Sequence, residues 1–182
     1  MNKYCYVRYT HITRFLAIGG MAVILLGMTC FAAGGRINSS RSIPLGLYWM
    51  TDDPVVKGAY VIFCPPESSL FDEALARGYI SAGFCPGDYG FMMKRVLATG
   101  NDRVDMTGKG IRINGKPLPA SIPLEADKAG RAMPRYPLGT YTLGKTELLL
   151  MSDMSGTSFD SRYFGPVDFS QIKGVIRPVL TW

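Results

Sequence analysis

Histidine is almost absent from this sequence. The one histidine, His11, stands ahead of a long apolar stretch, and most of the chain follows that stretch. A serine hydroxyl becomes a nucleophile when a nearby base removes its proton, and the usual base is histidine. If the stretch crosses a membrane, His11 lies on the opposite side from the rest of the chain. A Ser-His-Asp triad is therefore nearly excluded, and a catalytic serine would need another base, such as a lysine kept neutral by apolar neighbours.

Acidic residues are scarcer than basic ones, which gives a formal net charge of +6. Lys3, Arg8 and Arg14 carry half of that excess, and the remaining residues hold only +3, from 17 basic and 14 acidic side chains. No segment from Gly34 onward has the dense run of lysine and arginine that a nucleic-acid binder needs. We expect no nucleic acid among the partners.

Charge is missing altogether from residues 15–33. As a helix these 19 residues would span roughly 28 Å, close to the thickness of a bilayer core. The head, residues 1–14, has three basic and no acidic residues, which favours a cytoplasmic N-terminus. We therefore expect a head (1–14), a single transmembrane anchor (15–33) and one extracytoplasmic domain (34–182). For a bacterial chain this means the inner membrane, with the domain in the periplasm.

Two other interpretations of the N-terminus stay open. Ala32, Ala33 and Gly34 offer small residues for the cleavage of a signal peptide, although the apolar run exceeds the ~7–15 residues usual for such a signal. A lipoprotein modified at Cys30 is less favoured, because residues 27–29 (GMT) do not form the small apolar pattern that precedes a lipidated cysteine.

Cysteine is also scarce, and two of the four cysteines fall in the predicted domain. Cys64 and Cys85 are each followed by proline, and an oxidising compartment predicts a disulfide between them. The alternative is a pair of buried free thiols. Two cysteines without histidine support are too few for a zinc site, and we expect neither a metal nor a cofactor.

The domain has the pattern of a mainly β protein. Residues 71–77 predict one short helix before Gly78, and Asn114-Gly115 predicts a tight hairpin turn. Residues 116–137 hold five prolines and are interpreted as a long surface excursion. The predicted strands are residues 60–63, 89–97, 111–113, 141–142 and 147–151.

Three separate blocks give the chain a family resemblance. They are SRSIPLGLY at residues 40–48, MKRV at 93–96 with GND at 100–102, and SFDSRYFGPV at 158–167. With these blocks the chain resembles the type I signal peptidase superfamily of Ser-Lys proteases, and within it the TraF-type conjugative transfer peptidases. The resemblance implies a signal-peptidase-like β fold. Proline follows the serine by two positions here, whereas ordinary signal peptidases have a Ser-Met-x-Pro arrangement.

The first two blocks supply the implied catalytic pair, Ser42 as nucleophile and Lys94 as base. A lysine has an ordinary pKa near ~10.4, so it must be desolvated to act as a base near neutral pH. Met92 would share a strand face with Lys94, and Phe91, Met93, Val96 and Leu97 make the surroundings apolar. The resemblance also implies an oxyanion site made by the backbone N–H of Ser42 and the hydroxyl of Ser40. Arg41 lies between them, where signal peptidases have glycine.

The third block supplies supporting residues. The resemblance implies that Ser158 hydrogen-bonds the lysine amine and orients it, and that Asp160 and Arg162 form an ion pair that holds this corner. Ser152 and Met154 replace the glycine and asparagine expected ahead of the block. Each residue alone would more often be structural, whereas the three blocks together, in family order and spacing, favour the catalytic interpretation.

The predicted function is that of a membrane-anchored serine endopeptidase. The resemblance implies a membrane-inserted precursor as substrate, namely a pilin precursor of a conjugation apparatus, with small residues before the cut. Partners would be this precursor, the lipid bilayer and other conjugation proteins. The acyl-enzyme could be resolved by water or by the precursor's own amine, which would give a cyclic product. Alternatives are a non-catalytic assembly component and a LexA-like self-cleaving regulator, but the latter would carry a DNA-binding motif and no span.

Overall fold

The computed structural model describes residues 3–182, with side chains from residue 11 onward. It divides into two compact units, one ending at Arg36 and one comprising residues 37–182. Within the described range, the helices are α1 (Lys3–Ala32), α2 (Ser69–Ala76) and α3 (Ser161–Phe164), with short 3-10 turns η1 (Pro86–Asp88) and η2 (Phe169–Gln171). The strands are β1 (Gly35–Asn38), β2 (Gly46–Thr51), β3 (Tyr60–Phe63), β4 (Met92–Ala98), β5 (Arg103–Thr107), β6 (Gly110–Ile113), β7 (Lys116–Pro117), β8 (Gly139–Thr142), β9 (Glu147–Met151), β10 (Val167–Asp168) and β11 (Ile172–Thr181).

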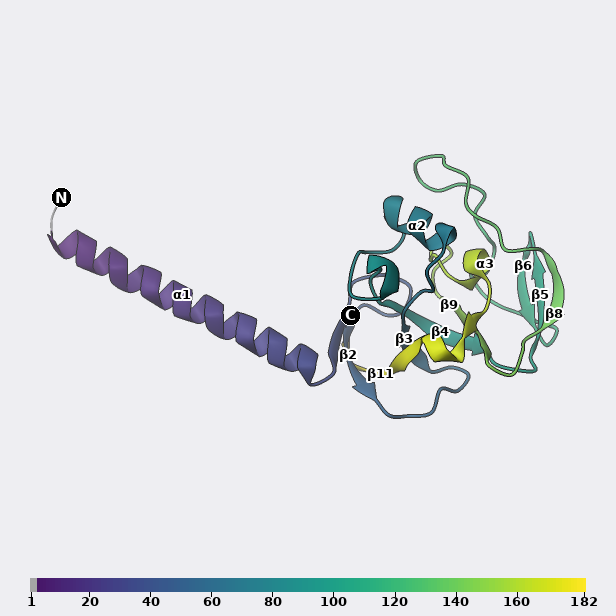
Figure 1. Cartoon of the computed structure of the whole chain (residues 1–182), viewed down its shortest axis with the longest axis horizontal. Helices are drawn as coiled ribbons and strands as arrows, with labels where there is room; N and C mark the ends of the chain where they lie inside the picture. Colours follow the sequence, from purple (N-terminus) through teal and green to yellow (C-terminus); the bar gives the residue numbers. More distant parts are fainter. Residues whose placement is uncertain (1–2) are drawn as a thin grey trace. The chain divides into compact units, whose positions relative to one another are not determined.

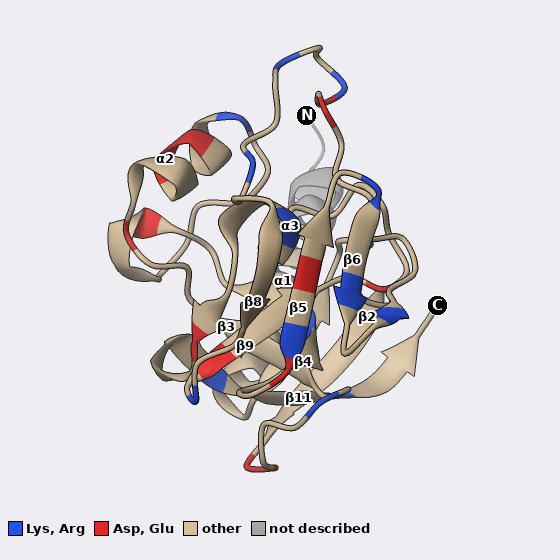
Figure 2. Cartoon of the chain, turned by 90° about the vertical axis from the view of Figure 1, so that its right-hand side faces the viewer, with Lys and Arg blue, Asp and Glu red and all other residues tan. Residues whose placement is uncertain are grey.

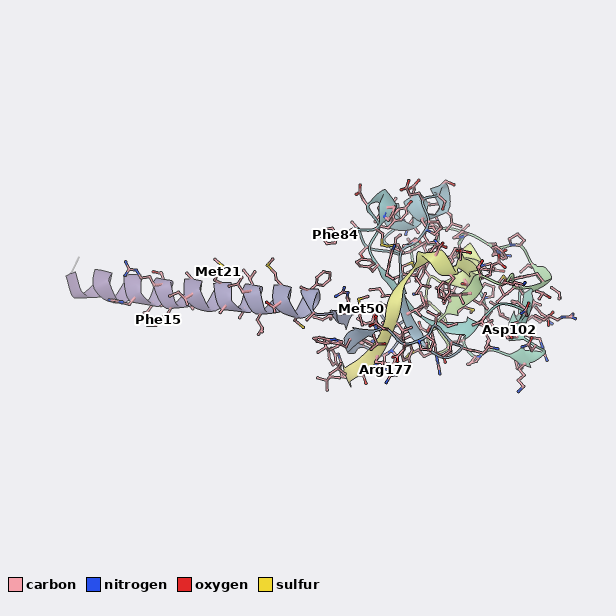
Figure 3. The ribbon with its side chains drawn as sticks, turned by 60° about the horizontal axis from the view of Figure 1, so that its bottom comes forward. Phe15, Met21, Met50, Phe84, Asp102 and Arg177 are labelled. Atoms are coloured by element: carbon pink, nitrogen blue, oxygen red, sulfur yellow. A yellow bond between two sulfur atoms is a disulfide. The ribbon has the colours of Figure 1, made fainter. Side chains whose placement is uncertain are left out.

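Helix α1 is long and apolar enough to cross a membrane. The apolar segment is His11–Ala32, with a mean hydropathy of 2.2. Phe15 and Met21 project into open space from different sides of the helix (Figure 3). A helix that is apolar all round and unburied suits a lipid environment better than water. The helix begins at Lys3 and so includes most of the expected head; the division into head, anchor and domain stays a prediction.

The second unit is mainly β, as the sequence predicted. Its larger sheet has the strand order β1-β2-β11-β3-β4-β9-β10, and its smaller sheet has the order β7-β6-β5-β8. Figure 1 shows β5, β6 and β8 at one end of this unit and β2 and β11 toward the other. Helices α2 and α3 pack on one face of the larger sheet, through Phe71 of α2 and Tyr163 of α3.

Strand β9 lies at the centre of the packing. Leu148 and Leu150 face the core beneath α2 and α3, whereas Leu149 and Met151 face a second core shared with β5 and β6. A strand buried on both faces has a continuous apolar sequence rather than an alternating one. This explains the run ELLLM in the sequence.

The smaller sheet carries charged side chains of both signs. Figure 2 shows acidic and basic residues on β5 and basic residues on β6. Arg103 and Asp105, two residues apart on β5, form an exposed ion pair at 3.3 Å.

Several predicted elements are confirmed. Strands β3 and β9 have the predicted bounds, and α2 begins two residues before the predicted start. Asn114 and Gly115 both have positive φ, at 51° and 82°, and they join β6 to β7 as the predicted hairpin. The excursion is largely irregular after β7. The strand predicted over 89–97 begins only at Met92, because residues 86–88 form η1 and Tyr89 makes just an isolated bridge to Ala82.

The sequence did not predict β1, β2, β5, β10 or β11. Strand β11 is the longest of the described strands and lies between β2 and β3, pairing antiparallel with both. Gly46, at the start of β2, has a φ of +153°, and a Cβ there would come within 2.1 Å of the Leu180 carbonyl oxygen. Glycine is therefore required where the loop from β1 enters this pairing.

Candidate active site

A cleft of about 670 Å³ opens on the second unit. Four segments line it, namely residues 37–42, residues 78–81, residues 91–94 and part of the loop 155–159. They come from the end of β1, the turn after α2, the start of β4 and the loop before α3. The three sequence blocks, distant along the chain, therefore each contribute to one cavity.

The loop between β1 and β2 carries Ser42. The next residue, Ile43, is fully buried among Tyr48, Ile62 and Ile176. The Tyr48 hydroxyl donates to the carbonyl of Pro44 at 2.7 Å, and burial is the main reason that the pKa of Tyr48 is raised to about 12. The loop is thus anchored on the core immediately after Ser42, which itself keeps 8% of its surface exposed.

Lys94 lies on β4, where buried and partly exposed residues alternate. Met92 and Val96, on the same face, are buried, and Lys94 itself is only 4% exposed. Its Nζ lies 2.6 Å from Ser42 Oγ. Burial lowers the pKa of Lys94 to about 8; the charge of Asp160 opposes this shift and that of Arg162 reinforces it. The amine can therefore lose its proton near neutral pH and accept one from the serine.

Ser158 also contacts the serine. Its hydroxyl donates to Ser42 Oγ at 3.1 Å. The family resemblance had implied a hydrogen bond between Ser158 and the Lys94 amine instead. Ser42 Oγ also lies 2.6 Å from the Lys94 amine, so it is the hydrogen-bond partner of both groups. Through this hydrogen bond Ser158 helps to orient the Ser42 hydroxyl.

Asp160 and Arg162 form a fully buried ion pair, with Nη2 of Arg162 2.7 Å from Oδ2 and Nε 2.8 Å from Oδ1. Asp160 is also the N-cap of α3, accepting from the backbone N–H of Arg162, and it accepts from the N–H of Ser152 at 3.1 Å. Every carboxylate oxygen is therefore occupied, as a buried charge requires.

The remaining donors of Arg162 hold the loop that carries Ser158. They reach the carbonyls of Ser155 at 2.9 Å, Gly156 at 3.0 Å and Ser158 at 3.0 Å, and that of Ala120 in the excursion at 2.7 Å. A rigid guanidinium is suited to such a set of fixed acceptors. The ion pair expected from the third block is thus present, and Arg162 links Ser158 to the excursion, through Ala120, and to α3.

Ser40 lies in the wall of the cleft, two residues before Ser42. Its hydroxyl donates to Oδ1 of Asn38 at 3.0 Å. The oxyanion role implied for Ser40 and for the N–H of Ser42 stays a prediction.

Cys64 and Cys85 form the predicted disulfide, with Cα atoms 5.4 Å apart. The bridge encloses α2 and the turn at residues 78–81, which forms one rim of the cleft. It therefore restrains a part of the site, besides its effect on the unfolded chain. Within the described part of the chain, no group of three or more His, Cys, Asp or Glu side chains could hold a metal ion.

Sequence reasoning assigned no role to Asn38, and it noted Ser152 only as a replacement for an expected glycine. Both are buried, and the Ser152 hydroxyl accepts from the backbone N–H of Met154 and Ser155 where β9 ends. A signal was present for Asn38, because asparagine followed by two serines is typical of a turn held by its own side chain.

The family model and the relatives found by sequence give one consistent assignment. The family model described as signal peptidase, peptidase S26, matches residues 9–182. A plasmid transfer protein TraF of Escherichia coli is 59% identical over 167 residues, which cover 92% of this chain and 94% of that protein. A conjugal transfer protein TraF of Agrobacterium fabrum is 38% identical over 176 residues, covering 94% and 96%. A signal peptidase I structure from Enterococcus faecalis covers 70% of this chain and all of that chain, with 16% identity and a TM-score of 0.41.

Proposed function

The chain belongs to the peptidase S26 family of signal peptidases, and from its site we propose that it is a membrane-anchored serine endopeptidase with a Ser42-Lys94 dyad. The observation that carries the proposal is the 2.6 Å contact between Ser42 Oγ and the Lys94 amine. Lys94 is buried, and its pKa is lowered to about 8. A lysine in this setting can act as a base, which a surface lysine cannot do at neutral pH.

The chemistry follows from these two groups. Neutral Lys94 takes the proton of Ser42 as Oγ attacks the carbonyl carbon of the scissile peptide bond. The resulting ammonium then gives that proton to the leaving amine, so that the C–N bond breaks and an ester to Ser42 remains. A second nucleophile, either water or an amine of the precursor, loses its proton to Lys94 and attacks the ester carbon. The bond between that carbon and Ser42 Oγ breaks, and the Lys94 ammonium returns a proton to Oγ, which regenerates the serine and the neutral amine.

The anchor limits where the site can act. Residues 33–41 separate the apolar segment of α1 from Ser42, and fully extended they reach no more than about 35 Å. Ser42 is therefore confined to cleavage sites near the bilayer surface. We assign the domain to the periplasmic side of the inner membrane, supported by the basic head and by a disulfide that persists only in an oxidising compartment.

The relatives direct the proposal toward conjugation. Their names are those of plasmid and conjugal transfer proteins, so the proposed substrate is an exported precursor of a conjugation apparatus, such as a pilin. Small side chains before the cut would fit the cleft best, since the bulky residues Ile80, Met92 and Phe159 line it.

A processing assay tests this function. Full-length protein in detergent micelles is incubated with a pilin precursor, and the products are weighed by mass spectrometry. We expect cleavage by the parent and by the control Lys173→Met, an exposed lysine on β11, and no cleavage by Ser42→Ala or Lys94→Met. A product lighter than the linear fragment by one water would identify cyclisation. Normal processing by Ser42→Ala would refute the proposal and favour a non-catalytic assembly role.

A further inference from the structure

Asn38, the last residue of β1, uses both polar atoms of its buried side chain on one loop. Its Nδ2 lies 2.7 Å from the carbonyl oxygen of Ser40, 3.0 Å from that of Ile43 and 3.0 Å from that of Pro44. Its Oδ1 accepts from the N–H of Ser40 at 3.2 Å and from the Ser40 hydroxyl at 3.0 Å. The side chain is 4% exposed and lies in the wall of the cleft.

These partners bracket the nucleophile. Ser40 precedes Ser42 by two residues, and Ile43 and Pro44 follow it directly, so one amide group joins the two arms of the bend that carries Ser42. An amide NH₂ has two hydrogens, and with three acceptors at least one hydrogen is shared. Together these bonds fix the path of the loop on both sides of Ser42.

A loop of this kind has no ladder of its own to hold it. Buried backbone carbonyls need partners, and here Asn38 contacts three of them, while the Tyr48 hydroxyl also donates to that of Pro44. A small displacement of a reacting atom lowers a rate far more than it lowers stability. The position of Ser42 Oγ against Lys94 therefore depends on Asn38, although Asn38 itself does not contact Lys94.

We propose that Asn38 is a positioning residue for the reaction, which holds Ser42 Oγ against the Lys94 amine and holds the Ser40 hydroxyl at the cleft wall. The inference rests on the proposed peptidase function. A hydroxyl has one hydrogen, so Ser40 cannot donate to Asn38 and to an oxyanion together. Asn38 thus fixes the position of the Ser40 oxygen. During attack the Ser40 hydroxyl rotates about this oxygen, so that its hydrogen leaves Asn38 Oδ1 and is donated to the oxyanion.

The test is steady-state kinetics of full-length protein in detergent micelles with a precursor peptide, from pH 6 to pH 10. For Asn38→Ala we expect kcat to fall by about 100-fold, while KM stays within about twofold because the polar atoms of Asn38 are engaged by the loop rather than by substrate. The pH midpoint should stay at that of the parent, because Lys94 keeps its place on β4. Asn38→Ser has a hydroxyl that can still donate to one carbonyl, so its kcat should lie between those of the parent and Asn38→Ala. If Asn38→Ala does not fold, the kcat of Asn38→Ser tests the inference in its place.

Two control variants separate positioning from loss of stability. Asn114→Ala removes an amide that also makes two side-chain hydrogen bonds, but on the smaller sheet, and it should keep the kcat of the parent. Tyr48→Phe removes a bond to the same Pro44 carbonyl without touching Ser40, and its loss in kcat should be several-fold smaller than that of Asn38→Ala. Thermal melts establish that each variant is folded at the assay temperature.

A double-mutant cycle with Ser40→Ala completes the test. If Asn38 acts partly through Ser40, the double variant should lose less activity than the product of the two single losses. Strictly multiplicative losses, a kcat within threefold of the parent for folded Asn38 variants, or a shifted pH midpoint would overturn the inference. Unimpaired Ser42→Ala would instead refute the proposed function itself, whatever the Asn38 variants do.

Discussion

Replacing Lys94 by methionine should make the protein more stable at neutral pH. The pKa of Lys94 is lowered by burial to about 8 from its ordinary value of 10.5. Between these two values the unfolded chain binds more protons than the folded one, so stability rises with pH. The lowered pKa of Lys94 reduces the free energy of unfolding by its full amount below pH 8. This reduction becomes smaller between pH 8 and pH 10.5 and is absent above pH 10.5.

The magnitude follows from the two pKa values. Proton linkage gives a cost of about 3 kcal/mol at pH 7 and about 2 kcal/mol at pH 9. Methionine has a similar length and no charge, so Lys94→Met removes this cost. The lost hydrogen bond to Ser42 takes back about 1 kcal/mol. The variant should therefore be more stable than the parent by about 2 kcal/mol at pH 7 and about 1 kcal/mol at pH 9.

Guanidinium unfolding of full-length protein in detergent micelles measures this difference. The fluorescence of Trp49 and Trp182, both in the second unit, reports on that unit. Lys173→Met serves as control, since Lys173 is exposed, and its difference from the parent should not change with pH. A Lys94→Met variant less stable than the parent at pH 7, or a gap that does not shrink toward pH 9, would show that Lys94 is not a buried lysine with a lowered pKa.

Further predictions concern activity and support of the site. Because the amine must be neutral, turnover should rise about tenfold between pH 7 and pH 9, with a midpoint near the pKa of Lys94, about 8; a profile flat over this range would contradict the dyad. Arg162→Ala strands a buried carboxylate and should cost roughly 3–5 kcal/mol in unfolding together with activity; a melt like the parent's would contradict this. Ser158→Ala should keep the melting temperature of the parent and lower kcat; processing at the normal rate would show that Ser158 does not orient the Ser42 hydroxyl. Replacing Cys64 and Cys85 by serine should cost on the order of 3 kcal/mol, and an unchanged denaturation midpoint would contradict it.

Local signals account for the parts of the fold that the sequence predicted. Strand β9 is continuously apolar, and Asn114-Gly115 accepts the positive φ of a tight turn. The disulfide was predicted from the count of cysteines after the span and the expected compartment. None of these features depends on knowing a distant partner.

Strand β11 shows why the rest was not predicted. It contains Gly174 and Pro178, which usually argue against a strand, and six of its ten residues are exposed. Its pairing with β2 and β3 supplies the stability that its own sequence lacks. The register shifts near both residues absorb the irregularity, and only the folded sheet reveals them.

The candidate site divides in the same way. Ser42, Lys94 and the third block were selected by a family pattern. The structure brings Ser42, Lys94 and Ser158 to one cleft, and Asp160 and Arg162 form a buried pair outside its lining. The partner of Ser158 and the role of Asn38 depend on distances between side chains, which spacing along the chain does not give. Asn38 had a local turn signal, but its bonds to Ile43 and Pro44 exist only in the folded loop.

The central claim, that Ser42 is the nucleophile activated by Lys94, is tested most directly by trapping the acyl-enzyme. Full-length protein is mixed with precursor, quenched in acid within a single turnover, digested and analysed by mass spectrometry. We predict an ester of the precursor fragment on the peptide containing Ser42, present in the parent and absent in Lys94→Met. An adduct on another residue, or an equal amount of ester on Ser42 in Lys94→Met, would contradict the account.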